Sequence, residues 1–89
     1  MENIMTTNIY KEAVDKWGVP AQMNMMIEEC SEAILAIRHW DRRRIPTMKM
    51  VEEFVDVYLM SKQMEYIFPK EFQEMLDYKI NRLKKRLES

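Results

Sequence analysis

Apolar positions recur with a helical period along most of the chain, and apolar–polar alternation typical of strands is absent. The pattern predicts an all-α protein with four helices, over residues 8–17, 20–40, 47–63 or 47–64, and 69–87. Gly18, the only glycine, is expected to stop the first helix. Pro20 and Pro69 suit the first turns of the second and fourth helices, where a backbone N–H is not needed. Thr47 is expected to cap the third helix.

The second predicted helix separates apolar from acidic side chains. At about 100° per residue, one broad side carries a set of apolar residues. These are Met23, Met26, Ile27, Cys30, Ala33, Ile34 and Ile37. Glu28, Glu29 and Glu32 project from the other side.

The third predicted helix is apolar around nearly its whole circumference. A helix of this kind is normally buried. Two of its acidic residues, Glu53 and Asp56, lie among Met50, Val57 and Met60. We therefore expect these two carboxylates to be drawn into the interior or into a subunit interface.

Composition narrows the class of protein. The 89 residues fit one domain, residues 1–89, and a net charge of −1 gives no general attraction to nucleic acid. Cys30 is the only cysteine, which favours a reducing compartment. The first residues lack the basic and apolar regions of a secretory signal, and no apolar run is long enough to span a membrane. A soluble, cytoplasmic protein is expected.

The acidic residues lack the positive partners that helix surfaces usually supply. Where Lys or Arg often stands four residues after a glutamate, Glu28 has Glu32. Glu53 has Asp56 three residues later, and Lys49 alone offers a local positive charge. Carboxylates buried without a partner are costly, and Mg²⁺ and Mn²⁺ prefer carboxylate oxygens. Glutamates on the second helix alone are more typical of a solvated face, but a second acidic pair on an apolar helix favours a metal site.

The acidic residues also form two short motifs. Glu28-Glu29-Cys30-Ser31-Glu32 reads E-E-x-x-E, and Glu53-Phe54-Val55-Asp56 reads E-x-x-D, with twenty residues between them. Trp17-Gly18 and Gln22 precede the first motif. This arrangement, over roughly residues 10–86, resembles the MazG-like all-α nucleoside triphosphate pyrophosphohydrolases. The resemblance implies a four-helix MazG-like bundle that is completed by oligomerisation, as a homodimer or homotetramer.

The resemblance further implies a function and a role for each acidic residue. Such a protein hydrolyses a nucleoside or deoxynucleoside triphosphate to the monophosphate and pyrophosphate with Mg²⁺, or with Mn²⁺ in its place. Glu29, Glu32, Glu53 and Asp56 match the metal ligands of the family. Glu28 matches the catalytic glutamate that positions the attacking water or accepts its proton.

Other residues are candidates for the substrate. Lys79, Arg82 and Arg86 lie on one side of the fourth helix and are expected to meet phosphate oxygens. Basic residues near a helix C-terminus also complement the helix dipole without any ligand. Trp40 either stacks on a base or packs on the fourth helix. His39 lies on the same side of its helix as Glu28, where it either contacts phosphate or is an ordinary surface residue.

Two alternative functions compete with pyrophosphohydrolysis. One is a non-catalytic helical oligomer that binds nucleotide or another partner without cleaving it. The other is a ferritin-like di-iron protein, but that class uses Glu-x-x-His motifs and none occurs here. Neither nucleic acid nor a membrane is an expected partner.

Overall fold

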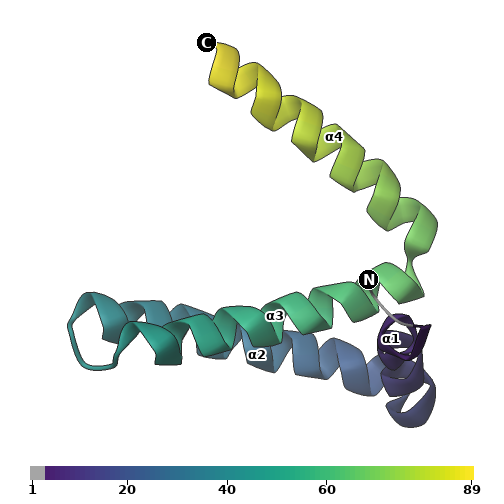
Figure 1. Ribbon diagram of the computed structural model, residues 1–89, viewed down its shortest axis with the longest axis horizontal. Coiled ribbons are helices and arrows are strands. Elements are labelled where there is room, and N and C mark those ends of the chain that lie inside the picture. The colour runs from purple at the N-terminus through teal and green to yellow at the C-terminus, as the bar shows by residue number, and fades with distance from the viewer. Residues whose placement is uncertain (1–3) are drawn as a thin grey trace.

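The computed structural model describes residues 4–89, and their side chains from residue 9 onward. Over this part of the chain it contains four helices and no strand: α1 (Ile4–Trp17), α2 (Val19–Asp41), α3 (Thr47–Ile67) and α4 (Pro69–Glu88) (Figure 1). The all-α fold and the order of the helices are as predicted. α1 begins before the expected residue 8, and α3 continues past the expected residue 64. None of these helices is both long and apolar enough to cross a membrane.

The turns between helices follow from a few residues. Gly18 has a φ of 90°, which glycine adopts without strain, and it is the residue that precedes α2. The prediction that Thr47 caps α3 is wrong, because Pro46 occupies that position and no side chain caps the helix. Thr47 instead is the first residue of α3, and its Oγ1 accepts a hydrogen bond of 3.1 Å from Trp40 Nε1. This bond ties the two ends of the loop between α2 and α3 together.

α2 and α3 form a long antiparallel hairpin, and α1 packs against both helices at one end of it (Figure 1). α4 leaves that end at an open angle, contacts only α3, and has no buried residue. One chain therefore does not close a four-helix bundle, within the part of it that the structure describes.

Among the side chains that the structure describes, the core is small and contains two polar residues. Its buried apolar residues are Val14, Ala33, Ala36, Met50 and Met60. Gln22 on α2 and Gln63 on α3 are also buried, and Gln22 Nε2 donates a hydrogen bond of 2.6 Å to Gln63 Oε1. This bond joins α2 to α3, and Gln63 Nε2 in turn donates to Met60 Sδ at 3.6 Å.

Loss of this buried pair should destabilise the protein. Gln22→Ala leaves the Gln63 amide buried without its partner, which costs about 1–3 kcal/mol of unfolding free energy. Gln73→Ala is a matched control, because Gln73 makes a similar bond of 2.9 Å to Asp77 on the exposed surface of α4. Urea denaturation should show a clear loss of unfolding free energy for Gln22→Ala and little change for Gln73→Ala. Equal stability of the two variants would contradict the importance of the buried pair.

Candidate metal centre

Three carboxylates from two helices converge where α2 and α3 pack together. Ala33 and Ala36 are buried in this contact, and such small side chains let the two helices approach closely. Glu29 lies one turn before Ala33, on the same side of α2, and is half-buried. Glu53 and Asp56 lie opposite it on α3 and are also half-buried. One carboxylate oxygen from each of the three acids lies within 4.8 Å of the other two.

The three acids of this cluster could hold a metal ion. Mg²⁺ holds oxygen ligands at about 2.1 Å, so that opposite ligands are about 4.2 Å apart. The three carboxylate oxygens lie within 4.8 Å of one another, close to this largest separation between two ligands of one ion. Carboxylates are also the ligands that Mg²⁺ and Mn²⁺ prefer. Cys30, the chain's only cysteine, is not a member of the cluster.

Two oxygens of the cluster are buried without a partner. Oε2 of Glu29 and Oε2 of Glu53 have no hydrogen-bond donor among the described residues. Burial raises the pKa of Glu29, and the negative charges of Glu32 and Asp56 raise it further. Burial and the same two neighbours also raise the pKa of Glu53, which the positive charge of Lys49 partly opposes. The negative charges of these neighbouring carboxylates repel one another, and a bound cation would relieve that repulsion.

The other two predicted acids lie at the margin of the cluster. Glu32 is exposed, but its charge raises the pKa of both Glu29 and Glu53, so its carboxylate lies near them. It does not belong to the compact group of three. Glu28 is exposed and is also outside that group. Its exposed carboxylate is accessible to water.

A hollow of about 210 Å³ opens beside the cluster, toward the loop between α2 and α3. Glu32 and Glu53 line one part of it, and His39, Lys49 and Ile45 also contribute to its wall. From the sequence, Lys49 was expected only to offset the charge of Glu53. His39 was expected either to contact phosphate or to be an ordinary surface residue. The spacing along each helix places both residues on the acidic side. His39 follows Glu32 by about two helical turns, and Lys49 precedes Glu53 by about one.

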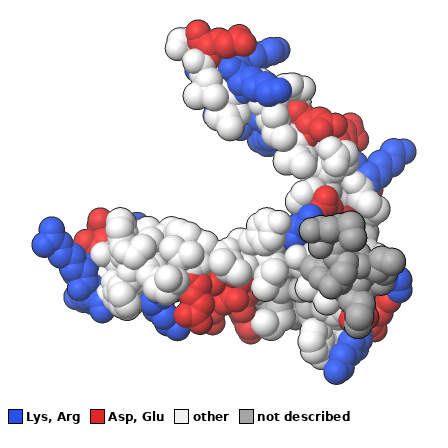
Figure 2. Space-filling model, in the orientation of Figure 1, with Lys and Arg blue, Asp and Glu red and all other residues white. Residues whose placement is uncertain are grey.

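The predicted substrate residues do not meet the cluster within one chain. Lys79, Arg82 and Arg86 are exposed on α4, which makes no contact with α2 in the described structure. Figure 2 shows acidic side chains gathered along the lower edge of the hairpin, whereas α4 projects from its upper side. Trp40 lies near the C-terminal end of α2, more than two turns beyond Glu32, and borders a separate hollow at the loop. The packing of Trp40 on α4 that sequence reasoning allowed does not occur.

Comparison of the chain with protein-family models, with curated proteins and with solved structures finds no match. The site is therefore interpreted from its own residues and geometry, and from the two acidic motifs in the sequence.

Proposed function

We propose that the protein is a Mg²⁺-dependent nucleotide pyrophosphohydrolase that converts a nucleoside or deoxynucleoside triphosphate into the monophosphate and pyrophosphate. The observation that carries the proposal is the convergence of Glu29, Glu53 and Asp56, with two buried oxygens that have no partner among the described residues. The MazG-like order of the two acidic motifs supports the choice of reaction. A MazG-like bundle formed by several chains belongs to the same proposal.

Each acidic residue has a distinct task in this reaction. Glu29, Glu53 and Asp56 hold the cation, and Glu32 completes its ligands from the margin of the cluster. A bound Mg²⁺ neutralises phosphate charge and acidifies a water molecule. Glu28 accepts a proton from the water that attacks the α-phosphorus, and the bond to the bridging oxygen of the β-phosphate breaks. The pyrophosphate that leaves carries that oxygen.

The hollow beside the cluster provides a place for the remaining phosphates. Lys49 and His39 border it on the side next to Glu53 and Glu32. Among the residues whose side chains are described, Lys49 has one ion-pair partner, Glu52, at 3.5 Å between exposed side chains. This weak pair leaves Lys49 available to a phosphate. We assign phosphate contact to Lys49, with His39 beside it.

Removal of the Lys49 charge should weaken substrate binding. A hydrogen bond between a charged donor and a charged acceptor contributes about 1.5–3 kcal/mol, so Lys49→Ala should raise KM roughly tenfold or more. Steady-state kinetics with saturating Mg²⁺ measure this effect. Lys70→Ala, which removes an exposed lysine from the start of α4, should leave KM unchanged. An unchanged KM in Lys49→Ala would show that Lys49 does not contact the substrate.

A panel of NTPs and dNTPs, incubated with the pure protein and Mg²⁺, tests the proposed reaction. The expected result is release of pyrophosphate and the matching monophosphate from at least one member, and none after chelation of the metal. Nucleotide that binds tightly in the presence of Mg²⁺ without cleavage would favour a non-catalytic binding module instead. Neither binding nor turnover across the panel would contradict the proposal.

A further inference from the structure

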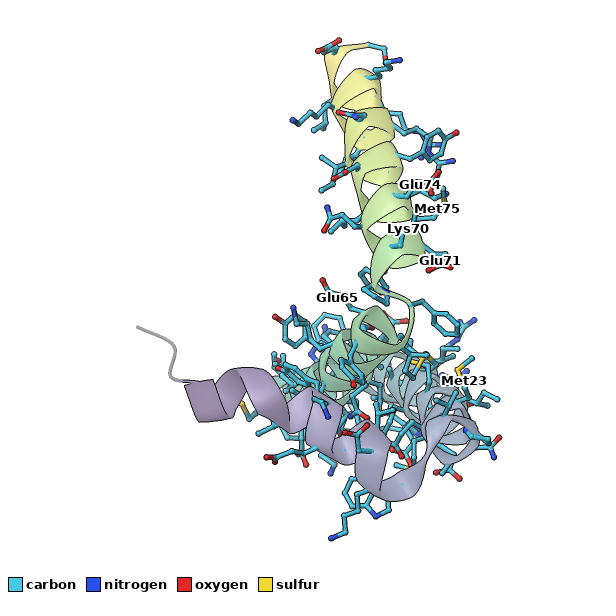
Figure 3. The ribbon with its side chains drawn as sticks, turned by 90° about the vertical axis from the view of Figure 1, so that its right-hand side faces the viewer. Met23, Glu65, Lys70, Glu71, Glu74 and Met75 are labelled. Atoms are coloured by element: carbon cyan, nitrogen blue, oxygen red, sulfur yellow. The ribbon has the colours of Figure 1, made fainter. Side chains whose placement is uncertain are left out.

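The loop between α2 and α3 borders a hollow that no step of the proposed reaction uses. Its volume is about 520 Å³, and it is lined by Trp40, Asp41, Arg43, Ile45, Pro46 and Thr47. This loop hollow lies at the end of the hairpin far from α1 and α4 (Figure 1). Figure 3, which looks along the hairpin from the α1 end, shows Lys70 and Met75 rising with α4 away from the hairpin. Within the part of the chain that the structure describes, neither α1 nor α4 therefore covers the hollow.

The loop hollow adjoins the hollow beside the candidate metal centre. Ile45 is half-buried and lines both this hollow and the smaller one next to Glu53 and Lys49. Thr47 precedes Glu53 by six positions on α3, which is about 9 Å along the helix axis. In a nucleotide, the sugar and its 5′-phosphate bridge a separation of this order. A triphosphate held at the metal can therefore extend its base into the loop hollow.

Trp40 offers a flat surface on which a base can stack. The residue is 42% exposed, and its Nε1–H donates the hydrogen bond of 3.1 Å to Thr47 Oγ1. Because this bond already fixes the indole, little side-chain freedom is lost when a ligand stacks on it. Stacking stabilises every base, since each has a flat face, and therefore does not select among them. Selection has to come from polar groups at the edge of the base.

Two charged side chains line the loop hollow and differ in their hydrogen-bonding character. The Asp41 carboxylate only accepts hydrogen bonds, whereas the Arg43 guanidinium only donates them. Neither forms an ion pair with another residue whose side chain is described. Arg43 has a φ of 59°, a left-handed conformation that is uncommon outside glycine, and its N–H donates to the Trp40 carbonyl at 2.9 Å. The turn is thus held in place by its own backbone, and both charges remain available to a ligand.

We propose that the substrate is a guanine nucleotide, and that Asp41 and Arg43 select its base in the loop hollow; this inference rests on the proposed function. Guanine carries two adjacent N–H donors, at N1 and N2, which match the two oxygens of a carboxylate. Its O6 and N7 are both acceptors, and arginine binds this pair with two hydrogen bonds. Adenine has an amino group in place of O6, which opposes the guanidinium, and the pyrimidines have no N7. Guanine is therefore the common base that complements both side chains.

Kinetics with a guanine triphosphate and its analogues, in whichever sugar series the protein cleaves, test this selection. The hypoxanthine analogue lacks the 2-amino group that Asp41 contacts, and the 7-deaza analogue lacks the N7 that Arg43 contacts. The kcat/KM for each analogue should be about tenfold or more below that for guanine, as expected when a hydrogen bond to a charged group is lost. The adenine triphosphate should be poorer still. Equal kcat/KM for guanine and adenine triphosphates would overturn the proposal.

Substitutions on the loop assign the selection to individual side chains. Asp41→Asn should lower kcat/KM for the guanine triphosphate and leave that for the hypoxanthine analogue nearly unchanged, so that the preference between them is lost. Arg43→Asn should do the same for the preference over the 7-deaza analogue, and asparagine tolerates the left-handed backbone. Arg44→Asn is the matched control, because Arg44 is exposed on the same loop but does not line the hollow. Full wild-type preferences in Asp41→Asn and Arg43→Asn would overturn the proposal.

Binding of monophosphates separates this inference from the proposed reaction. Trp17→Phe leaves Trp40 as the only tryptophan, and a guanine stacked on it should quench its fluorescence. With Mg²⁺ present, quenching by AMP should need about tenfold or more higher concentration than quenching by GMP. This result without hydrolysis of any triphosphate would contradict the reaction and support the guanine site. Hydrolysis with no preference for guanine, or equal quenching by GMP and AMP, would overturn the guanine site and leave the reaction standing.

Discussion

Glu53→Gln should abolish most of the Mg²⁺-dependent release of pyrophosphate. The substitution keeps the size of the side chain but replaces a charged ligand atom of the cluster with a neutral amide. Stabilisation of the transition state by a metal ion is worth several kcal/mol, and each 1.4 kcal/mol is a factor of ten in rate. We therefore expect kcat/KM to fall on the order of 100-fold or more. Asp56→Asn should have an effect of the same kind.

Glu52→Gln provides the matched control for this loss. Glu52 precedes Glu53 on α3, carries the same carboxylate, and points into solvent with a side chain that is 60% exposed. Its substitution should leave kcat/KM close to the wild-type value. If Glu53→Gln retained full activity, or if both variants lost activity equally, the cluster could not be the catalytic metal centre.

Mg²⁺ should stabilise the folded protein strongly. A ligand that binds only the folded state contributes about 2.7 kcal/mol at one hundred times its dissociation constant. For a domain this small, that corresponds to an increase in Tm of about 10–20 °C. Glu29→Gln should remove most of this increase because it removes one ligand. Without metal, the same variant should melt above the wild-type protein, because it relieves repulsion at a carboxylate whose pKa burial already raises.

Thermal melts with and without Mg²⁺, at one fixed protein concentration, measure both effects. Glu74→Gln serves as the control, because Glu74 is exposed on α4 and lies outside the cluster. It should keep the full response to Mg²⁺. A wild-type Tm that does not change with Mg²⁺, or a Glu29→Gln variant that responds as the wild type does, would contradict metal binding at this site.

The sequence predicted the helices well because the signals for them are local. Gly18 and Pro69 each stand at a boundary where the backbone changes direction, and periodicity covers the segments between them. The error at Thr47 has a physical reason. Threonine is a favoured N-cap residue in general, but here Pro46 occupies the N-cap position and the Thr47 hydroxyl accepts a hydrogen bond from the indole of Trp40.

The buried side of α2 could not be derived from the sequence in the same way. Periodicity identifies the most apolar side, with Ile27 and Ile34 at its centre, but not the molecule that covers it. Within the chain, α2 turns Ala33 and Ala36 toward α3 and leaves the isoleucines exposed. A hydrophobic pattern has the same form whether its partner is a helix of the same chain or of a second one.

Part of the candidate site could be predicted from the spacing of acidic residues along each helix. Spacings of three and four residues place acids on one side of each helix, and the structure brings Glu29, Glu53 and Asp56 together. The position of α4 depends on the turn at Phe68 and on packing, which residue spacing does not encode. The separation of Lys79, Arg82 and Arg86 from the cluster within one chain, and the hollow beside Lys49, became visible only in three dimensions.

The central claim is that the cluster of Glu29, Glu53 and Asp56 holds a divalent cation. Titration with Mn²⁺, followed by the paramagnetic resonance signal of the free ion, measures this binding directly. We predict that the wild-type protein binds at least one Mn²⁺ per chain, that Mg²⁺ competes for the site, and that Glu53→Gln loses the binding while Glu52→Gln retains it. Absence of binding by the wild-type protein, or binding that survives Glu53→Gln unchanged, would contradict the claim.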